Sequence, residues 1–333
     1  MKILITGAAG FIGSHLVDLL LAEGVKHSDL KLLIPVGESL DNLPKKPFEI
    51  IRGDIRDKKV VQKAMEGVQI VYHLAARIDF DGKSYAEYKD VNVDGTQNLL
   101  DSSRDKKLQK FVFFSSIGVF GLPAGIGDII NWDENHPKTY TNFYGESKYE
   151  GEKRVIEAYD KWKIPYAIIR PASVYGPREK GPTLGLYKAI KNHQFIMIGD
   201  GSNKMHYVFV TDLVKAARLA QLSKKPTGDY IIGGQNADRF IDIANSVATS
   251  INMKIPRFFL PKTLALAVSY IMEFVGNITG IKFPLFPSRV RTMTTSYFYN
   301  ISKVQKELGY DPQIDFRKGS KITGEWYMQN KLL

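Results

Sequence analysis

The chain of 333 residues contains no cysteine, so it has no disulfide framework and no thiolate metal site. It also lacks an apolar run long enough to span a bilayer. Its most apolar stretch, residues 258–276, is interrupted by Lys262 and Glu273. A buried or interfacial helix is therefore expected there. We expect no metal site. The absence of thiols fits a reducing compartment, and with no signal peptide apparent we expect the cytoplasm.

Acidic residues are outnumbered: 46 lysines and arginines face 35 aspartates and glutamates, which gives a formal net charge of +11. The basic residues are spread along the whole chain, and no aromatic-rich nucleic-acid motif accompanies them. We therefore expect no nucleic-acid partner. The charge instead indicates a solvated basic surface with some attraction for anionic ligands.

The first half of the chain alternates short apolar segments with longer amphipathic ones. Strands are predicted at residues 2–6, 30–36, 48–54, 68–76, 109–116 and 165–171, and helices at 11–24, 58–67, 84–106 and 142–160. This rhythm, with strands that are continuously apolar, predicts an α/β fold: a Rossmann-type, doubly wound parallel sheet with helices on both faces.

The pattern loosens after Pro171, and further helices are predicted at residues 211–222, 240–250, 262–276 and 302–308. We predict two domains. Residues 1–170, together with about 205–235, form a dinucleotide-binding domain. Residues from about 171 to 204, together with 236–333, form a smaller, mostly helical substrate domain.

The glycine-rich segment ITGAAGFIG places Gly7, Gly10 and Gly13 directly after a predicted strand and at the start of a predicted helix. The first glycine allows a tight turn, the second lets a pyrophosphate approach the backbone, and the third lets helix and strand pack closely. The helix N-terminus then faces the phosphates. This context predicts a dinucleotide site.

The segment YGESK puts Tyr144 and Lys148 one turn apart on the same face of a predicted helix. By itself, this spacing is most often a solvated surface. In a site, however, the same pair would be a phenol held beside a cation, able to transfer a proton. The pentapeptide alone leaves both interpretations open.

Taken together, these motifs resemble the extended short-chain dehydrogenase/reductase family, which includes nucleotide-sugar epimerases and 3β-hydroxysteroid dehydrogenase-like enzymes. The resemblance covers most of the chain. Further matching segments are GDIRD (53–57), HLAA (73–76), VNVDGTQNLL (91–100), FFSSIGVFG (113–121), RPASVYGP (170–177), HYVFVTDL (206–213) and SKVQKELGY (302–310).

The resemblance implies a catalytic trio of Ser116, chosen over Ser115, with Tyr144 and Lys148. The resemblance also implies that Asp54, followed by Ile55, reads the adenine amino group and that Asn92 braces the central strands. The implied cofactor-binding residues are Gly7, Gly10, Phe11, Ile12, Gly13, Asp54, Ile55, Leu74, Ala75, Ala76, Asn92, Tyr144, Lys148 and Pro171.

The chemistry accounts for these residue types. A secondary alcohol gives up a hydride only if its proton also leaves, and an unperturbed tyrosine, with a pKa of roughly 10, is a weak base near neutrality. We expect Lys148, together with the positive nicotinamide ring, to favour the Tyr144 phenolate. Lys148 would also bind the cofactor ribose, and Ser116 would hold the substrate oxygen.

The end of the second predicted strand favours NAD as the cofactor, without excluding NADP. Pro35 occupies the critical position, Glu38 follows, and no arginine is nearby in the sequence. The phosphate of NADP would therefore lack a cationic partner and would be repelled by Glu38.

Residues that differ from those of particular branches of the family reduce the number of substrate classes to consider. Ile117 and Gly118 replace the Asp-Glu pair of the family's dehydratases, which argues against water elimination. Ser173 and Met205 replace an asparagine and an arginine typical of UDP-sugar epimerases. A diphosphate could still find cations among Arg178, Lys180, Lys204, Arg289 and Arg291.

The sequence thus predicts an NAD(P)-dependent oxidoreductase acting on a secondary alcohol or ketone, either lipophilic or part of a nucleotide-sugar. The alternatives are a nucleotide-sugar 4-epimerase and a non-catalytic dinucleotide-binding sensor or assembly factor. The apolar helix within residues 258–286 would shape a lipophilic pocket, touch a membrane surface or simply pack on the core. By resemblance, the helices at 84–106 and 142–160 would pair two copies as a homodimer.

Overall fold

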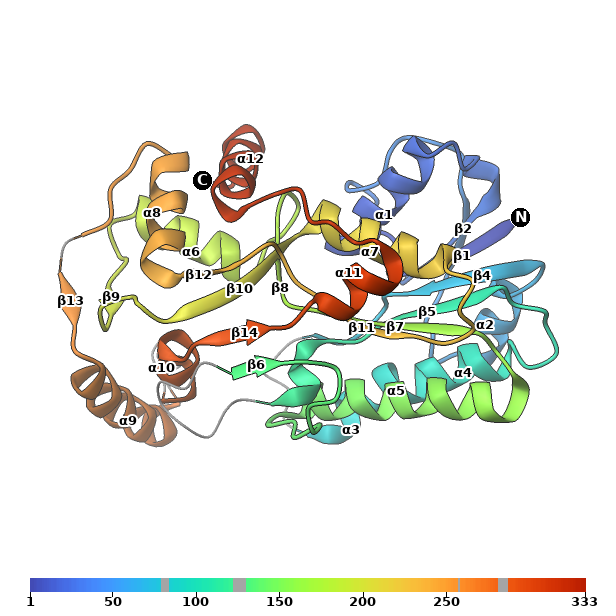
Figure 1. Cartoon of the computed structure of the whole chain (residues 1–333), viewed down its shortest axis with the longest axis horizontal. Coiled ribbons are helices and arrows are strands. Elements are labelled where there is room, and N and C mark those ends of the chain that lie inside the picture. Colours follow the sequence, from blue (N-terminus) through green and yellow to red (C-terminus); the bar gives the residue numbers. More distant parts are fainter. Residues whose placement is uncertain (79–83, 122–129, 257, 281–286) are drawn as a thin grey trace.

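A seven-stranded parallel sheet lies in the half of the protein that contains the N-terminus (Figure 1). The computed structural model describes residues 1–78, 84–121, 130–256, 258–280 and 287–333. The strand order is β11-β7-β5-β4-β1-β2-β3. The strands are β1 (Lys2–Thr6), β2 (Leu30–Ile34), β3 (Glu49–Arg52), β4 (Val68–His73), β5 (Lys110–Phe114), β7 (Tyr166–Pro171) and β11 (Asp229–Ile232). The order reverses between β1 and β4, which confirms the doubly wound fold.

Helices cover both faces of this sheet (Figure 1). One face carries α1 (Phe11–Ala22), α7 (Val210–Leu222) and α11 (Ser302–Leu308), and the other carries α2 (Lys58–Ala64), α4 (Gly95–Asp101) and α5 (Phe143–Trp162). Successive strand residues point to opposite layers: Ile3 and Ile5 belong to the core with α1 and α7, whereas Leu4 belongs to the core with α2 and α5. Both faces of the sheet are thus covered by apolar cores, which explains why these strands are continuously apolar.

A second, smaller sheet, in the order β12-β10-β8, lies beside the first. Its strands are β8 (Ser173–Tyr175), β10 (Lys204–Phe209) and β12 (Ala237–Arg239), and its core is shared with α6 (Pro182–Lys191), α8 (Phe240–Ser250) and α12 (Phe316–Gln329). The sequence did not predict α6 or α12. The domain boundaries remain a prediction, although β10 pairs with β8 and β12 and not with the main sheet.

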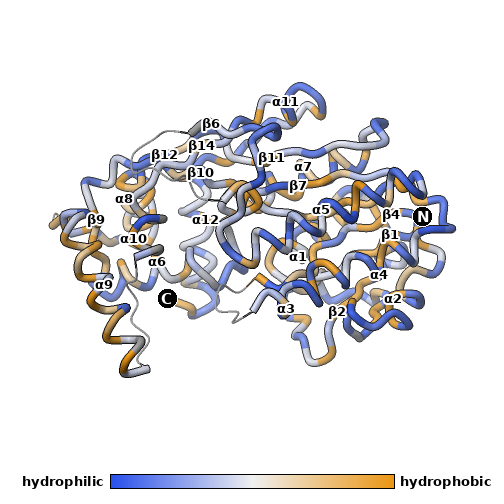
Figure 2. The backbone as a smooth tube through the Cα atoms, turned by 90° about the horizontal axis from the view of Figure 1, so that it is seen from below, coloured by the Kyte–Doolittle hydropathy of each residue, from blue (hydrophilic) through white to orange (hydrophobic). Residues whose placement is uncertain are grey.

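The remaining elements lie at the edge of this second unit. They are the strand pairs β6 (Ile130–Trp132) with β14 (Tyr297–Tyr299) and β9 (Met197–Ile198) with β13 (Phe259–Leu260), and the helices α9 (Lys262–Thr279) and α10 (Pro287–Thr294). Figure 2 shows α9 extending away from the body of the molecule. Within the described ranges, no helix is both long and apolar enough to cross a membrane.

The helix predicted at 84–106 is interrupted. A short α3 (Tyr85–Tyr88) leads into a π-helical segment, Lys89–Asp94, before α4 begins at Gly95 and ends at Asp101. The wider π turn is a local irregularity of the kind that often marks functional sites. Here it carries Asn92, whose side chain is buried.

The turn from β1 into α1 depends on glycine because the backbone folds closely on itself. Gly7 has a φ of +71°, and a Cβ atom on Gly13 would lie 2.2 Å from the Gly7 carbonyl oxygen. Gly10 donates its backbone N–H to the same oxygen at 3.1 Å. The N-cap of α1 is Gly10, which has no side chain to accept the first N–H groups of the helix.

We expect Gly13→Ala to destabilise the protein by roughly 1–3 kcal/mol, because its new methyl group meets backbone that cannot move aside cheaply. Urea unfolding measures the change. The matched control is Gly185→Ala on α6, where a Cβ atom would meet nothing within 4 Å. That change is expected to gain about 0.5–1 kcal/mol, since alanine favours helix over glycine. Equal stability of Gly13→Ala and the native protein would contradict the assigned packing.

Candidate active site

Ser116, Tyr144 and Lys148 come together where β5 and the first turns of α5 meet. The Ser116 hydroxyl, just beyond β5, is hydrogen-bonded to the Tyr144 hydroxyl and also accepts the backbone N–H of Gly118 at 3.0 Å. Asn142 caps the N-terminus of α5, and its side-chain oxygen accepts the Gly145 N–H at 2.8 Å. The cap fixes where the helix starts and therefore where Tyr144 lies.

A close backbone contact makes this meeting possible. A Cβ atom on Gly145 would lie 2.4 Å from the carbonyl oxygen of Gly118, so only glycine lets α5 approach the 3₁₀ turn Ile117–Phe120 this closely. Tyr144 neighbours Gly145 and is carried against Ser116 by the same contact. The glycine of YGESK is thus a packing requirement of the site.

Lys148 lies one turn further along α5, with its side chain buried. Its ammonium donates a hydrogen bond to the carbonyl oxygen of Phe114 at 2.7 Å and sits 5.0 Å from the ring centre of Phe113. Burial lowers the pKa of Lys148 to about 7, and the negative charge of Glu152 opposes that shift. Near neutral pH, the Lys148 side chain is therefore divided between its charged ammonium form and its neutral amine form.

Burial raises the pKa of the Tyr144 phenol to about 12, and the hydrogen bond with Ser116 opposes that shift. In the protein alone, Lys148 does not lower this pKa overall, and the expectation, which includes the positive nicotinamide ring, stays a prediction. The cost of dehydrating a phenolate outweighs the attraction of a lysine whose own charge is weakened by burial and which is hydrogen-bonded to Phe114. Tyr144 is thus held as a neutral proton donor.

The two adjacent serines have different partners. Ser115 is buried and donates to Glu152 of α5 at 2.5 Å, whereas Ser116 bonds to Tyr144. Glu152 also receives two hydrogen bonds of 2.8 Å from Arg170 on β7. Arg170 in turn pairs with Asp229 of β11 at 2.7 Å. This geometry supports the choice of Ser116 over Ser115.

A buried histidine that the sequence did not single out supports the end of β4. His73 lies between two threonine hydroxyls, with Nδ1 2.7 Å from Thr6 and Nε2 2.9 Å from Thr96. Thr6 also accepts the backbone N–H of Ala75 at 3.1 Å. The three groups thereby fix the segment Leu74–Ala76, which the sequence assigns to the cofactor. Burial lowers the pKa of His73 to about 3, with a smaller contribution from Lys148.

Asn92 braces a different part of the protein from the one expected. Its side-chain amide donates to the Arg77 carbonyl at 3.0 Å and to the Ser147 hydroxyl at 2.8 Å, and its oxygen accepts the Arg77 N–H at 2.8 Å. It therefore ties the segment after β4 to α5 and does not join the central strands. These contacts within the protein support a bracing role more than direct cofactor contact.

The glycine turn and the start of α1 together fit a pyrophosphate, because a Cβ atom would fill the close approach and the N-cap Gly10 brings no side-chain acceptor to the first N–H groups of the helix. Phe11 and Ile12 form the first turn of this helix. Asp54 and Ile55 follow β3, and Pro171 ends β7. These residues therefore lie at or just beyond the carboxyl ends of neighbouring parallel strands, where α/β sheets bind ligands.

Two details at this edge differ from the simplest expectation. The Asp54 carboxylate is paired with Arg56 at 2.7 Å, which lowers the pKa of Asp54. An arginine also lies beside the second strand after all: Arg52, at the end of β3, donates to the carbonyl oxygens of Pro35 at 3.0 Å and Glu38 at 2.8 Å. Sequence distance concealed it, because β2 and β3 are neighbours in the sheet.

The lysines and arginines that could bind a diphosphate do not form one cluster in the described contacts. Arg178 forms an ion pair of 2.7 Å with Asp18 of α1, and Arg291 donates to the Tyr270 hydroxyl of α9 at 2.8 Å. Lys180 and Lys204 are exposed, and the Arg289 side chain lies outside the described side chains. Ser173 is on β8 and Met205 on β10.

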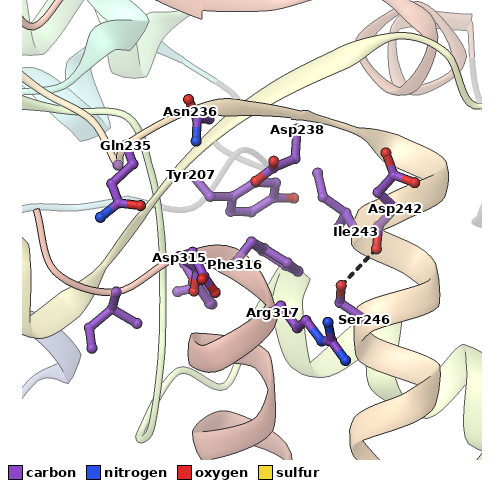
Figure 3. Close-up of a pocket in the computed structure, with 13 residues that line it drawn as sticks. Tyr207, Gln235, Asn236, Asp238, Asp242, Ile243, Ser246, Asp315, Phe316 and Arg317 are labelled. Atoms are coloured by element: carbon purple, nitrogen blue, oxygen red, sulfur yellow. Dashed lines mark hydrogen bonds between the residues drawn. The ribbon is translucent and has the colours of Figure 1, made fainter.

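A hollow of about 280 Å³ lies in the second unit, away from the residues above (Figure 3). Its lining includes Tyr207, Asp238, Asp242, Asp315 and Arg317, and it shares no residue with the trio or the glycine turn. Two of its carboxylates already have structural tasks: Asp242 pairs with Arg239, and Asp315 caps α12. We therefore place the candidate active site at the sheet edge.

Comparison with known proteins agrees with this geometry. The profile of the NAD dependent epimerase/dehydratase family matches residues 3–233. N-acetyl-alpha-D-glucosaminyl-diphospho-ditrans,octacis-undecaprenol 4-epimerase of Escherichia coli O157:H7 is 29% identical across 91% of this chain and 88% of that protein. The 3beta-hydroxysteroid-dehydrogenase/decarboxylase isoform 1 of Arabidopsis thaliana is 27% identical across 96% and 78%. The structure of UDP-glucuronic acid 4-epimerase from Bacillus cereus in complex with NAD matches with a TM-score of 0.76, at 25% identity across 99% of both chains.

This chain therefore belongs to the NAD-dependent epimerase/dehydratase family, within the extended short-chain dehydrogenases/reductases. It is an NAD-dependent enzyme of that class, and the predicted family and cofactor are confirmed. Its relatives include both epimerases and steroid dehydrogenases.

The buried His73 makes stability depend on pH. Its pKa is about 3 in the folded protein but near 6.5 when unfolded, so the unfolded chain binds the proton more readily between these values. The free energy of unfolding should thus fall as the pH drops from about 6.5, by roughly 2 kcal/mol on reaching pH 5. Urea unfolding at both pH values measures this loss in the native protein and in His73→Gln. An equal loss in both proteins would contradict the assignment.

Proposed function

We propose that the protein transfers a hydride between NAD and a secondary alcohol or ketone, with Ser116, Tyr144 and Lys148 as its catalytic residues. The observation that carries the proposal is the hydrogen bond between the Ser116 and Tyr144 hydroxyls, with Lys148 buried one helical turn away. A half-buried phenol without such neighbours would have only a packing role.

When bound, NAD supplies the hydride acceptor for oxidation and, once reduced, the hydride donor for reduction. In reduction, the Tyr144 hydroxyl gives its proton to the forming alkoxide oxygen, while the Ser116 hydroxyl holds that oxygen in place. In oxidation, Tyr144 would act as the phenolate and take the alcohol proton, and the positive charge of oxidised NAD, once bound, would favour that form. An ammonium group carries three N–H donors, and Phe114 accepts one from Lys148, which leaves others to bind the cofactor ribose.

A second candidate function is 4-epimerisation of a sugar carried by a diphosphate group. It uses the same first oxidation, followed by return of the hydride to the opposite face of the ketone. The relationship to an enzyme named for a sugar on undecaprenyl diphosphate favours it, as does the similarity to UDP-glucuronic acid 4-epimerase. Ser173 and Met205 make a lipid-linked sugar or another lipophilic alcohol a better candidate than a plain UDP-sugar.

We also propose a cytoplasmic homodimer that pairs through the helices around α4 and α5. Phe143 and Ile156 of α5 are each about two-fifths exposed, which is unusual for large apolar residues unless a partner covers them. Sedimentation equilibrium decides the matter, and a monomer at micromolar concentration would refute the dimer.

We expect Tyr144→Phe to lower kcat by about 10²–10⁴-fold, because it removes the transferable proton and leaves the helix intact. Turnover is measured on a panel of nucleotide-sugars, polyprenyl-diphosphate sugars and 3β-hydroxysterols, and NAD affinity is measured by titration calorimetry. The matched control, Tyr149→Phe, removes another hydroxyl from the same helix and should keep its activity. Full turnover by Tyr144→Phe on a verified substrate would overturn the mechanism.

The two candidate functions predict different fates for NAD. An epimerase regains its starting cofactor in each cycle, so we expect NAD to co-purify, with turnover giving no net change in absorbance at 340 nm. A dehydrogenase exchanges its cofactor and accumulates NADH. Denaturing the purified protein and quantifying the released nucleotide, together with an absorbance assay on the same panel, separates the two outcomes.

A further inference from the structure

The helix α9 has its apolar side facing outward. Its exposed large residues include Leu264, Ile271, Phe274 and Ile278, which are 50–70% exposed. Their spacing of seven, three and four residues places them on one face of the helix. A surface helix normally turns such a face toward the core. Here the face is left uncovered by the described parts of the chain, and it is long and continuous.

The opposite face of α9, which packs on the protein, is made of smaller residues. Ala265 and Ser269 are fully buried, and Ala265 joins a small cluster with Ile198 and Val290. The only charged residues in the helix sequence are Lys262 and Glu273, and helical geometry places both away from the exposed apolar face. The outward apolar face is therefore not interrupted by charge.

The apolar surface continues beyond the helix onto the neighbouring strands. Phe258 is 65% exposed, Phe259 43% and Ile196 52%. β13 and β9 are paired, with Phe259 opposite Met197. Phe258 and Ile196 each come directly before one member of that residue pair, where these parallel strands begin. Figure 2 shows that this end of the molecule is where α9 projects from the body. We call these residues and the exposed face of α9 the α9 surface.

The part of the sequence that carries the α9 surface is basic. Between residues 254 and 291 the sequence contains six lysines and arginines and one acidic residue. Within this stretch Arg291 is exposed, and its guanidinium donates to the Tyr270 hydroxyl of α9, which sets a cation beside the apolar residues. Apolar and aromatic groups next to cations form the pattern that binds the interface of an anionic bilayer.

We propose that the α9 surface binds the surface of an anionic membrane, with α9 lying in the plane of the interface. The basic charge favours anionic lipid over a second copy of the chain, because two identical basic surfaces repel each other. The helix is about 27 Å long at 1.5 Å per residue and binds along its side without spanning the bilayer. The inference goes beyond the proposed reaction and does not depend on it.

Co-sedimentation with lipid vesicles tests the proposal. We expect the purified protein to bind vesicles of phosphatidylcholine with phosphatidylglycerol, to release them at high salt, and to bind vesicles of phosphatidylcholine alone only weakly. Phe274→Asp and Ile271→Asp should each lower the partition coefficient by roughly tenfold or more, since each removes a large apolar contact. The matched control is Leu222→Asp, which makes the same kind of change at another exposed apolar position, on α7.

Failure of the native protein to bind anionic vesicles at low salt would overturn the proposal. So would an equal loss of binding in all three variants, because the effect would then be one of net charge. A dimer that Phe274→Asp converts to monomer, with vesicle binding unchanged, would assign the α9 surface to a second copy instead. The lipid and salt comparisons use the native protein alone, so they decide the matter even if a variant fails to fold. NAD binding, measured in parallel, keeps this result separate from the proposed reaction.

Discussion

The buried ion pair between Arg170 and Glu152 is the interaction on which the rest of the site depends. Both side chains are almost completely buried, and together they link β7 to α5, with Asp229 extending the link to β11. Removing one partner from such a pair typically costs about 3–5 kcal/mol, because the other charge is left uncompensated. Since Glu152 lies one turn beyond Lys148, the pair also sets the position of α5 and the electrostatic surroundings of Lys148.

Water exclusion determines the acid–base character of the site more than any single neighbour does. The pKa of Tyr144 rises to about 12 and that of Lys148 falls to about 7, in both cases mainly because burial disfavours the charged form. The protein alone therefore holds a neutral phenol beside a weakly held ammonium. Any added positive charge at this edge would favour the phenolate, which links the proton transfer to the oxidation state of the coenzyme.

The sequence predicted the central fold well because its signals are local. A parallel sheet that is buried on both faces requires continuously apolar strands, and the turn after β1 requires glycine. Both requirements can be recognised in short segments of the sequence. The trio was predicted from the resemblance to the family, because the spacing of Tyr144 and Lys148 alone left both interpretations open. By contrast, α12 escaped prediction: Gly319 and Gly324 weaken its helical pattern, although a Cβ atom at Gly319 would lie 2.2 Å from the Tyr175 hydroxyl oxygen. The glycine there serves packing and does not end the helix.

The sequence could not reveal contacts between segments that are far apart along the chain, or pKa shifts that depend on how deeply a group is buried. Arg170 and Glu152 meet only because β7 and α5 pack together, and His73 is recognisable only once Thr6 and Thr96 are seen on either side of it. The direction in which the protein alone shifts the pKa of Tyr144 was hidden for a related reason. Spacing shows that a lysine is near but does not show how much water is excluded from both groups.

The guanidinium of Arg52 has a practical consequence for redesigning coenzyme choice. It is bound to two backbone carbonyls, those of Pro35 and Glu38, and so acts as a strut for the loop that follows β2. If Arg52 instead bound a 2′-phosphate, its hydrogen bonds to these carbonyl oxygens would break and the loop would become less ordered. A variant meant to accept the phosphorylated coenzyme therefore has to bring in a new cation, most simply in place of Glu38, and leave the strut untouched.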